Sequence, residues 1–165
     1  MDRHLTPALH VPEQPDDADR TAILAPLAAF NRRHAEPGVV GPLAVLLRDE
    51  AGATVGGLWG ATVFRWLKIE LLFVPEELRG MSVGATIMTR AEALAVTRGC
   101  IGASLDTYSF QARGFYERLG YTLVGTIEDC PPGGARHFLR KRFRSRPQDQ
   151  KITLAEVKKS GFPAT

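Results

Sequence analysis

One segment of the chain, residues 66–99, limits the fold more than any other. In a regular strand over residues 66–74, one face would carry Leu67, Ile69, Leu71 and Phe73, and the other Trp66, Lys68, Glu70, Leu72 and Val74. Both faces are partly apolar, which is typical of a strand covered on two sides. Pro75 ends this strand, and the helix that follows has apolar residues at helical spacing and closes at Gly99. Its apolar stripe consists of Val83, Ile87, Met88, Ala91, Leu94 and Ala95. A central strand that leads into an amphipathic helix predicts an α/β protein.

The remaining elements predicted from periodicity complete a mixed sheet. We expect strands over residues 4–11, 43–47, 55–64, 101–105, 121–127 and 136–143, and helices over residues 17–35 and 110–119. Pro26 lies inside the first of these helices, so we expect a kink or two short helices there. Hairpins join the early strands and strand–helix–strand crossovers join the later ones, which predicts helices on both faces of the sheet.

Composition and charge describe one domain with a different C-terminal segment. The chain has 165 residues and 44% hydrophobic residues, which is the size of a single domain. The net charge of +3 is unevenly distributed along the chain. Residues 140–165 hold eight Lys or Arg and two Asp or Glu, whereas residues 1–139 hold 13 Lys or Arg and 16 Asp or Glu. We therefore expect a domain over residues 1–143 and a basic tail over residues 144–165. Nucleic-acid binding through this tail is an alternative that predicts salt-sensitive DNA affinity, but we do not expect nucleic acid as the partner.

The two cysteines and the N-terminal residues favour a reduced, cytoplasmic protein. Cys100 and Cys130 could form at most one bridge, and they have no spacing typical of a zinc site. Asp2 and Arg3 stand where a signal peptide would need an apolar core, and no stretch is long enough to cross a membrane. The four histidines are scattered along the sequence, so we expect no metal.

The loop between the central strand and its helix has the composition of an anion site. Small residues and Arg79 precede a helix start, where free N–H groups and the positive end of the helix dipole favour a phosphate or pyrophosphate. Neither G-x-x-x-x-G-K-[ST] nor a G-x-G-x-x-G after a strand is present, which disfavours ATP and NAD. A capped helix start beside an exposed arginine is the plainer interpretation of the same residues.

The same loop also satisfies the G-x-S-x-G pattern of serine hydrolases. Ser82 would be the nucleophile, and Asp129 and His137 follow in the order that such a triad requires. A nucleophile elbow needs its strand to run directly into the turn, whereas residues 75–79 intervene here. The chain is also short for that fold. The hydrolase is therefore the weaker alternative.

Two motifs together resemble the GNAT superfamily of acyl-CoA-dependent N-acyltransferases. The cofactor motif of that family, [RQ]-x-x-G-x-[GA], corresponds to Arg79–Gly84, and its late signature, A-x-x-F-Y-x-x-L-G-[FY], is matched in full by Ala112–Tyr121. The resemblance extends over residues 43–143. It implies a GNAT-like three-layer sandwich of the α/β (mixed α+β) class, with a central mixed, mostly antiparallel sheet of about seven strands and helices on both faces.

The resemblance also implies an acetyl-CoA cosubstrate and a set of binding residues. The pantetheine arm would pair with the backbone of Leu72, Phe73 and Val74. The pyrophosphate would be held by Arg79, Gly80, Met81, Ser82, Val83, Gly84 and Ala85. Tyr116 matches the tyrosine that protonates the departing thiolate, and a phenol with a pKa near 10 is protonated at neutral pH. Simple packing of Tyr116 beside Phe115 is the alternative.

Two residues depart from the family pattern. Ser82 stands where the family usually has the first glycine, so its side chain must fit near the phosphates. Ser109 stands where many members have an asparagine that touches the CoA arm, so we carry Ser109 forward as a cofactor-binding candidate whose contact is open.

The acceptor side of the site is less defined by sequence. Glu70, on the central strand, is the candidate general base, and Asp106 is the second choice. Glu70 could equally pair with Lys68 or Arg65, and a local bulge could turn it away. The aromatic residues that could line an acceptor pocket, or belong to the core, are Trp59, Phe64 and Trp66.

We therefore predict an N-acetyltransferase that moves acetyl from acetyl-CoA to a primary amine by direct attack in a ternary complex. No cysteine lies in the two motifs, so a covalent acyl-enzyme is not expected. The amine belongs to a small molecule or a peptide, and a homodimer is expected by analogy. The alternatives are a non-catalytic acyl-CoA-binding module and the hydrolase with Ser82.

Overall fold

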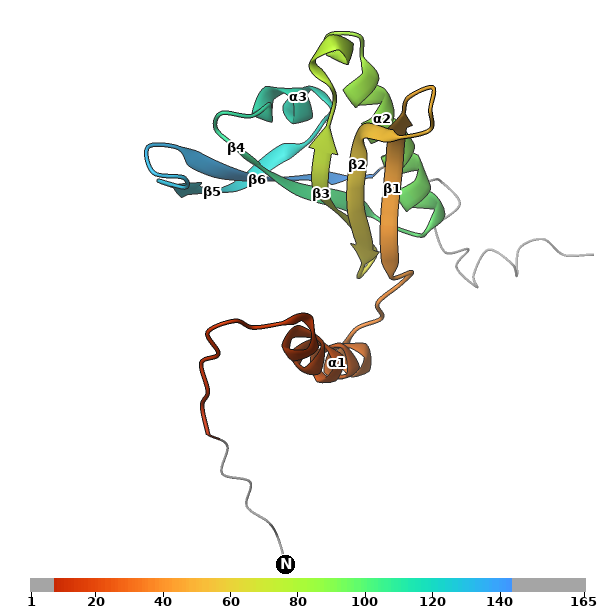
Figure 1. Cartoon of the computed structure of the whole chain (residues 1–165). Coiled ribbons are helices and arrows are strands. Elements are labelled where there is room, and N and C mark those ends of the chain that lie inside the picture. Colours follow the sequence, from red (N-terminus) through yellow and green to blue (C-terminus); the bar gives the residue numbers. More distant parts are fainter. Residues whose placement is uncertain (1–7, 144–165) are drawn as a thin grey trace, which may run out of the picture. The chain divides into compact units, whose positions relative to one another are not determined.

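The computed structural model describes residues 8–143, drawn in colour in Figure 1. By backbone contacts the chain separates into two compact units, Met1–Pro37 and Gly38–Thr165. The first unit holds α1 (Asp17–His34). The second holds β1 (Gly41–Arg48), β2 (Thr54–Val63), β3 (Trp66–Phe73), the 3-10 turn η1 (Glu76–Leu78), α2 (Val83–Thr97), β4 (Gly102–Tyr108), α3 (Arg113–Arg118), β5 (Thr122–Glu128) and β6 (Ala135–Arg142). The predicted basic tail, residues 144–165, lies outside the described residues.

α1 is one continuous helix of 18 residues, so the prediction of two short helices separated at Pro26 is wrong. A capping box fixes its start: Asp16 accepts from the backbone of Asp19, and the Asp19 carboxylate accepts from the backbone of Asp16. Arg32, Arg33 and His34 in the last turn complement the helix dipole. These terminal interactions favour the helix over its whole length, so that Pro26 removes one hydrogen bond without ending it.

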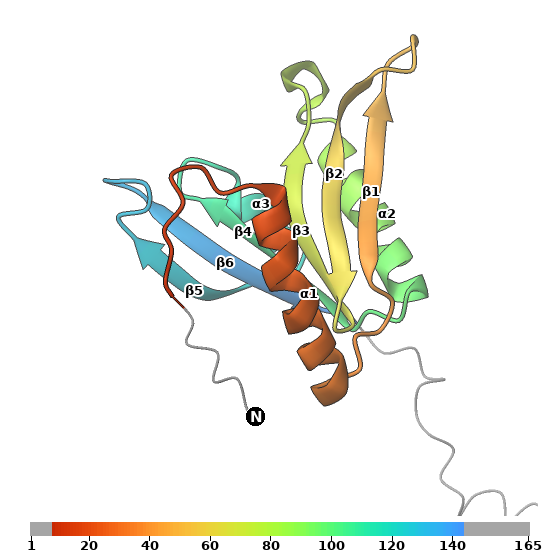
Figure 2. The same cartoon turned by 60° about the horizontal axis from the view of Figure 1, so that its bottom comes forward.

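A six-stranded sheet forms the second unit, with strand order β1-β2-β3-β4-β6-β5. All neighbours are antiparallel except β3 and β4, which are parallel. The predicted mixed, mostly antiparallel sheet is confirmed, with six strands in place of about seven. The missing strand is the first: residues 8–11 are not in a strand, and residues 4–7 lie outside the described part. Figure 2 shows the two antiparallel groups of strands, β1-β2-β3 and β4-β6-β5.

α2 covers the sheet with the stripe predicted from sequence. Ile87, Met88, Ala91 and Ala95 are buried. Leu94 was predicted to be buried with them, but it is 39% exposed and lies outside the core. The cluster that they join also contains Leu43, Leu58, Leu67, Ile69, Cys100, Ala103, Leu105, Tyr121 and Leu139. Phe115, Tyr116 and Leu119 of α3 pack against the same cluster, so the two helices share one core with the sheet.

A bulge in β3 changes which side chains face that core. Gly60 of β2 pairs with Ile69 and Trp59 pairs with Leu71, so Glu70 is the extra residue. Before the bulge Ile69 is buried; after it Leu72 packs on the core and Leu71 is 65% exposed. The strict alternation predicted for residues 66–74, with Leu71 on the side of Ile69, is therefore wrong beyond Glu70, because one inserted residue reverses the alternation.

Candidate active site

The sheet opens between its two parallel strands. β3 and β4 pair only at Trp66–Lys68 against Gly102–Ser104, yet β3 continues to Phe73 and β4 to Tyr108. Figure 1 and Figure 2 show the two strands separating beyond the paired residues. A cleft of about 1090 Å³ occupies this opening, and it is lined by residues of β3, β4, α3 and the start of α2.

The β3 wall of the cleft presents a backbone edge. Leu72 and Phe73 pair with β2 on one side and have no strand partner on the β4 side within the described residues. Together with Val74 they line the cleft, as the sequence predicted for a bound extended chain. A free strand edge offers alternating N–H and C=O groups, which is how an extended amide-containing ligand adds to a sheet.

The start of α2 lies at the same cleft and is not capped by a side chain. Gly80 and Ser82 have φ angles of 75° and 60°, so the loop turns twice through the left-handed region. Ser82 is the N-cap residue, but its side chain makes no capping hydrogen bond, and the first turn holds no acidic residue. In the described part of the chain, the first amides of α2 at Val83–Ala85 are therefore available to an anion.

Arg79 is held at the entrance of this loop. Its Nε donates to the backbone oxygen of Val74 at 3.1 Å, which ties the loop to the end of β3. No carboxylate pairs with Arg79 within residues 8–143. The remaining guanidinium N–H groups and the uncapped amides of α2 line one region of the cleft, and together they suit a phosphate or pyrophosphate.

Gly84, in the first turn of α2, allows Phe115 of α3 to pack closely against the start of that helix. A Cβ at this position would lie 3.2 Å from Cζ of Phe115 and 3.7 Å from a methyl carbon of Val74. A side chain at residue 84 would therefore displace Phe115 from the start of α2. The next residue in α3 is Tyr116, and both it and Phe115 pack against the core cluster.

Tyr116 lines the cleft from α3. Its ring packs edge-on against Phe115 at 5.1 Å and Tyr121 at 6.1 Å between centroids. Its hydroxyl makes no hydrogen bond to any group in residues 8–143. Burial, and secondly the charge of Asp106, raise the pKa of Tyr116 above its usual value. The phenol is thus held in the protonated form, which can donate a proton to a group in the cleft.

Glu70 reaches the cleft through the bulge of β3. The extra residue places its side chain among the cleft-lining groups, where its Oε1 lies 3.4 Å from Nζ of Lys68. Both side chains of this ion pair are largely exposed, at 41% for Glu70 and 62% for Lys68, so the pair is weakly held. The two roles considered for Glu70, cleft residue and partner of Lys68, are both present in the geometry.

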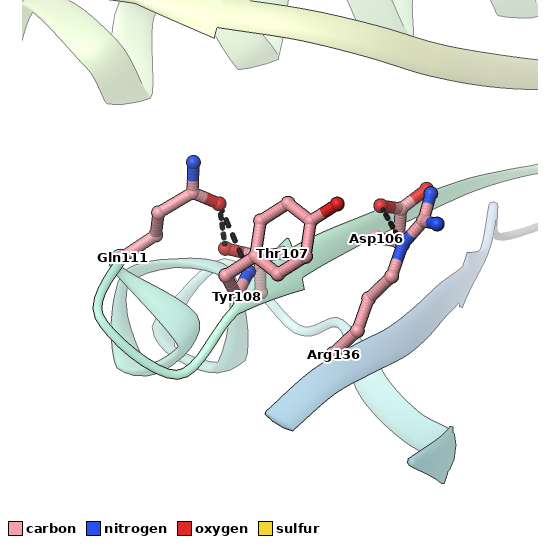
Figure 3. A network of polar contacts seen from close by, with 5 residues as sticks. All are labelled: Asp106, Thr107, Tyr108, Gln111 and Arg136. Atoms are coloured by element: carbon pink, nitrogen blue, oxygen red, sulfur yellow. Dashed lines mark hydrogen bonds and ion pairs between the residues drawn. The ribbon is translucent and has the colours of Figure 1, made fainter. Parts of the chain in front are cut away.

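On the opposite wall, β4 carries polar groups that the sequence predicted only in part. Asp106 lines the cleft and accepts a hydrogen bond from Nε of Arg136 on β6 at 2.7 Å. This bond raises the pKa of Arg136. The Arg136 guanidinium also stacks over the rings of Tyr108 and Phe138. Figure 3 shows the Asp106–Arg136 pair and, on the far side of Thr107 and Tyr108, Gln111, a cleft residue that sequence reasoning missed.

Two predicted residues are not brought to the cleft. Met81 is 67% exposed and does not line it. Ser109 also lies outside the lining: its hydroxyl accepts from the backbone N–H of Ala135 at 3.1 Å and its own N–H donates to the oxygen of the same residue. Ser109 therefore fastens β4 to β6. All the other predicted cofactor-binding residues line the cleft.

The alternative hydrolase triad is not assembled. Ser82 lines the cleft, whereas Asp129 and His137 do not. Nδ1 of His137 is 3.0 Å from the hydroxyl of Thr126, and Asp129 accepts from the backbone of Gly133. Neither member of the proposed triad is therefore beside Ser82 in the described residues, which argues against the hydrolase.

The rest of the described chain offers neither a metal site nor a second cleft with unpaired carboxylates. No group of three or more His, Cys, Asp or Glu is arranged to hold a metal ion within residues 8–143. A second hollow of about 520 Å³ shares no residue with the cleft. Of its three ionic residues, Glu92 and Lys141 pair with each other, and the guanidinium of Arg142 lies over the ring of Trp66. In the described part, no helix is both long and apolar enough to cross a membrane.

The chain is similar to known acetyltransferases over most of its length. The profile of the acetyltransferase (GNAT) family matches residues 4–121. A blasticidin-S acetyltransferase of Streptomyces morookaense is 45% identical over 95 residues, which are 57% of this chain and 70% of that protein. An acetyltransferase of Agrobacterium fabrum is 37% identical over 122 residues, which are 74% of this chain and 89% of that protein.

A solved structure extends the similarity to the fold. The crystal structure of an acetyltransferase from Agrobacterium tumefaciens superposes with a TM-score of 0.77 at 34% sequence identity, and the match covers 82% of this chain and 99% of that one. The resemblance inferred from Arg79–Gly84 and Ala112–Tyr121 is thereby confirmed. The chain belongs to the acetyltransferase (GNAT) family.

Proposed function

We propose that this acetyltransferase moves the acetyl group of acetyl-CoA to a primary amine of a small molecule, by direct attack within a ternary complex. The observation that carries the proposal is the opening between β3 and β4. There a free backbone edge, an uncapped helix start with Arg79, and a protonated Tyr116 line one cleft. These three features match, in order, an extended amide arm, a pyrophosphate and a thiol leaving group.

The edge of β3 and the start of α2 would bind different parts of acetyl-CoA. The pantetheine arm lies along Leu72–Val74 and adds to the free edge of β3. The pyrophosphate takes hydrogen bonds from Arg79 and from the amides of Gly80–Ala85, where the dipole of α2 favours negative charge. The backbone oxygen of Val74 accepts a hydrogen bond from Arg79, so this bond connects the site of the arm to the site of the pyrophosphate.

The chemistry then needs one base and one acid. Glu70 takes a proton from the ammonium form of the acceptor, directly or through water, and frees the lone pair on nitrogen. The nitrogen attacks the thioester carbonyl carbon, a C–N bond forms, and the C–S bond breaks. The sulfur leaves with the bonding pair and receives the proton of the Tyr116 hydroxyl, which burial keeps protonated. The new amide nitrogen then loses its second proton to water, and water returns a proton to the Tyr116 phenolate, so that both the amide and the phenol are neutral at the end. No cysteine lines the cleft, which agrees with direct transfer.

The acceptor we favour is a cationic small-molecule amine. Two carboxylates, Glu70 and Asp106, line the cleft from opposite walls. Asp106 is paired with Arg136, whereas Glu70 is held only by the exposed Lys68 and would attract an ammonium group. One relative is a blasticidin-S acetyltransferase, a name that indicates blasticidin S as its acceptor. This antibiotic is therefore the first acceptor to test on the present chain.

The test is thiol release from acetyl-CoA in the presence of a panel of amines. The panel contains blasticidin S, an aminoglycoside, a polyamine, an amino acid and a peptide. Sustained release with one small-molecule amine, accompanied by a product heavier by one acetyl group, supports the proposal. Release only with the peptide would overturn the small-molecule acceptor. Tight binding of acetyl-CoA without release from any amine would overturn the transfer reaction.

A further inference from the structure

Gln111 closes the loop between β4 and α3 with its side-chain oxygen. Oε1 accepts from the hydroxyl of Thr107 at 3.0 Å and from the backbone N–H of Tyr108 at 2.9 Å. Thr107 is only 2% exposed, so its hydroxyl depends on this partner. Figure 3 shows both bonds converging on the one oxygen.

This pattern determines which end of the Gln111 amide is oxygen. The backbone N–H of Tyr108 can only donate, so the atom that it meets must be an acceptor, which the amide nitrogen is not. Nε2 is then the other atom, and it keeps two N–H donors. Figure 3 shows Nε2 directed away from the loop. Within residues 8–143 neither of its donors meets an acceptor.

The free amide belongs to the wall of the cleft that faces β3. Gln111 lines the cleft together with Leu72 and Phe73, whose backbone edge forms the other wall. Ser109, two residues earlier, does not line the cleft; its hydroxyl accepts from the backbone N–H of Ala135 on β6. The donor that this loop offers to the cleft is the side-chain amide of Gln111.

We infer that Nε2 of Gln111 donates a hydrogen bond to an amide carbonyl of the pantetheine arm. The inference rests on the proposed use of acetyl-CoA. The arm contains two amide groups and would otherwise be hydrogen-bonded by the β3 backbone alone. Gln111 thereby positions the arm from the second wall, and the same side chain keeps its loop closed through Oε1.

The chain offers a matched pair of variants that separates these two tasks. Gln111→Glu retains an oxygen that accepts from Thr107 and Tyr108, and replaces the NH₂ donor by a second oxygen. Gln111→Leu removes both tasks and leaves the buried hydroxyl of Thr107 without its partner. The melting temperature of Gln111→Glu should therefore equal that of the parent, while that of Gln111→Leu should be lower.

The decisive measurement is calorimetric affinity for two ligands, CoA and adenosine 3′,5′-bisphosphate, which has phosphates but no pantetheine arm. Gln111→Glu should weaken CoA by about 10-fold or more and leave the bisphosphate unchanged, because only CoA presents a carbonyl to the lost donor. Equal weakening of both ligands would show a charge effect and overturn the inference, and so would unchanged CoA affinity. If the parent protein does not bind CoA at all, the proposed function fails, and the inference fails with it.

Discussion

Replacing Tyr116 with phenylalanine removes one oxygen atom and leaves the ring in its packing against Phe115 and Tyr121. The hydroxyl has no hydrogen-bond partner in residues 8–143, so the free energy of unfolding should change by no more than about 0.5 kcal/mol. Any large effect on turnover would therefore report on chemistry and not on folding.

The expected effect on the rate follows from the acid role. A positioned general acid contributes about 100- to 10,000-fold to a rate. The cleft is open, so water can protonate part of the departing thiolate in the variant, and we expect the lower end. A loss of about 100-fold in kcat corresponds to about 2.7 kcal/mol of transition-state stabilisation. Affinity for acetyl-CoA should stay unchanged, because the hydroxyl acts only when the C–S bond breaks.

The assay is single-turnover thiol release, which isolates the chemical step from product release. Tyr108→Phe is the matched control, because it deletes the same atom from a tyrosine that does not line the cleft. The ring of Tyr108 keeps its stacking on Phe110 in this variant. Since the pKa of Tyr116 is raised, the variant and the parent should differ by the same factor at all pH values up to about 10. A single-turnover rate in Tyr116→Phe that equals the parent's would remove this residue from the acid role.

Three further substitutions test other parts of the structure. Ser82→Gly should raise the free energy of unfolding by about 1 kcal/mol in denaturant titrations, because the φ of 60° is strained for serine; an equal or lower value would contradict this. Arg79→Gln should weaken CoA by about 10-fold and leave pantetheine unaffected, and equal affinities for CoA would remove Arg79 from the phosphate site. Burial, and secondly the Glu92 carboxylate, raise the pKa of Tyr121 far above 10, so the folded state keeps a proton that the unfolded state releases. The protein should lose stability as the pH rises above about 10, and Tyr121→Phe should flatten that loss; an unchanged alkaline slope would refute the link.

Much of the fold could be predicted because its signals are local. The stripe of α2, the turn at Gly99 and the hairpins depend on residues within a few positions of one another, and they were placed to within a few residues. Two predictions, the separation of α1 at Pro26 and the alternation of faces in β3, were wrong because interactions beyond the immediate sequence neighbours determine the structure there. The capping box carries α1 through Pro26, and pairing with β2 inserts the bulge at Glu70, which reverses the faces of the residues that follow.

The candidate site divides along the same line. The β3 edge, Arg79 and Tyr116 could be predicted because each belongs to a contiguous motif, and all three line the cleft. Gln111 and the Asp106–Arg136 pair lie between or beyond those motifs, and their roles depend on a loop closure and on a strand far away in the chain. Ser109 shows the reverse case, because it occupies a motif position but bonds to Ala135. No sequence pattern marks which of two neighbouring polar residues turns to the cleft.

Three small residues at the start of α2 serve different purposes: Gly80 and Ser82 precede the helix, and Gly84 lies in its first turn. Gly80 and Ser82 allow the backbone to turn so that helix amides face the cleft. Gly84 has a steric purpose, since a Cβ there would meet both Phe115 of α3 and Val74 at the end of β3. The strand edge, the anion site and the helix that carries Tyr116 therefore meet at this single contact. An added Cβ at residue 84 would require Phe115 to give way by a few tenths of an ångström, and a larger side chain by more. The cofactor motif and the helix that carries Tyr116 are therefore in direct contact at this residue.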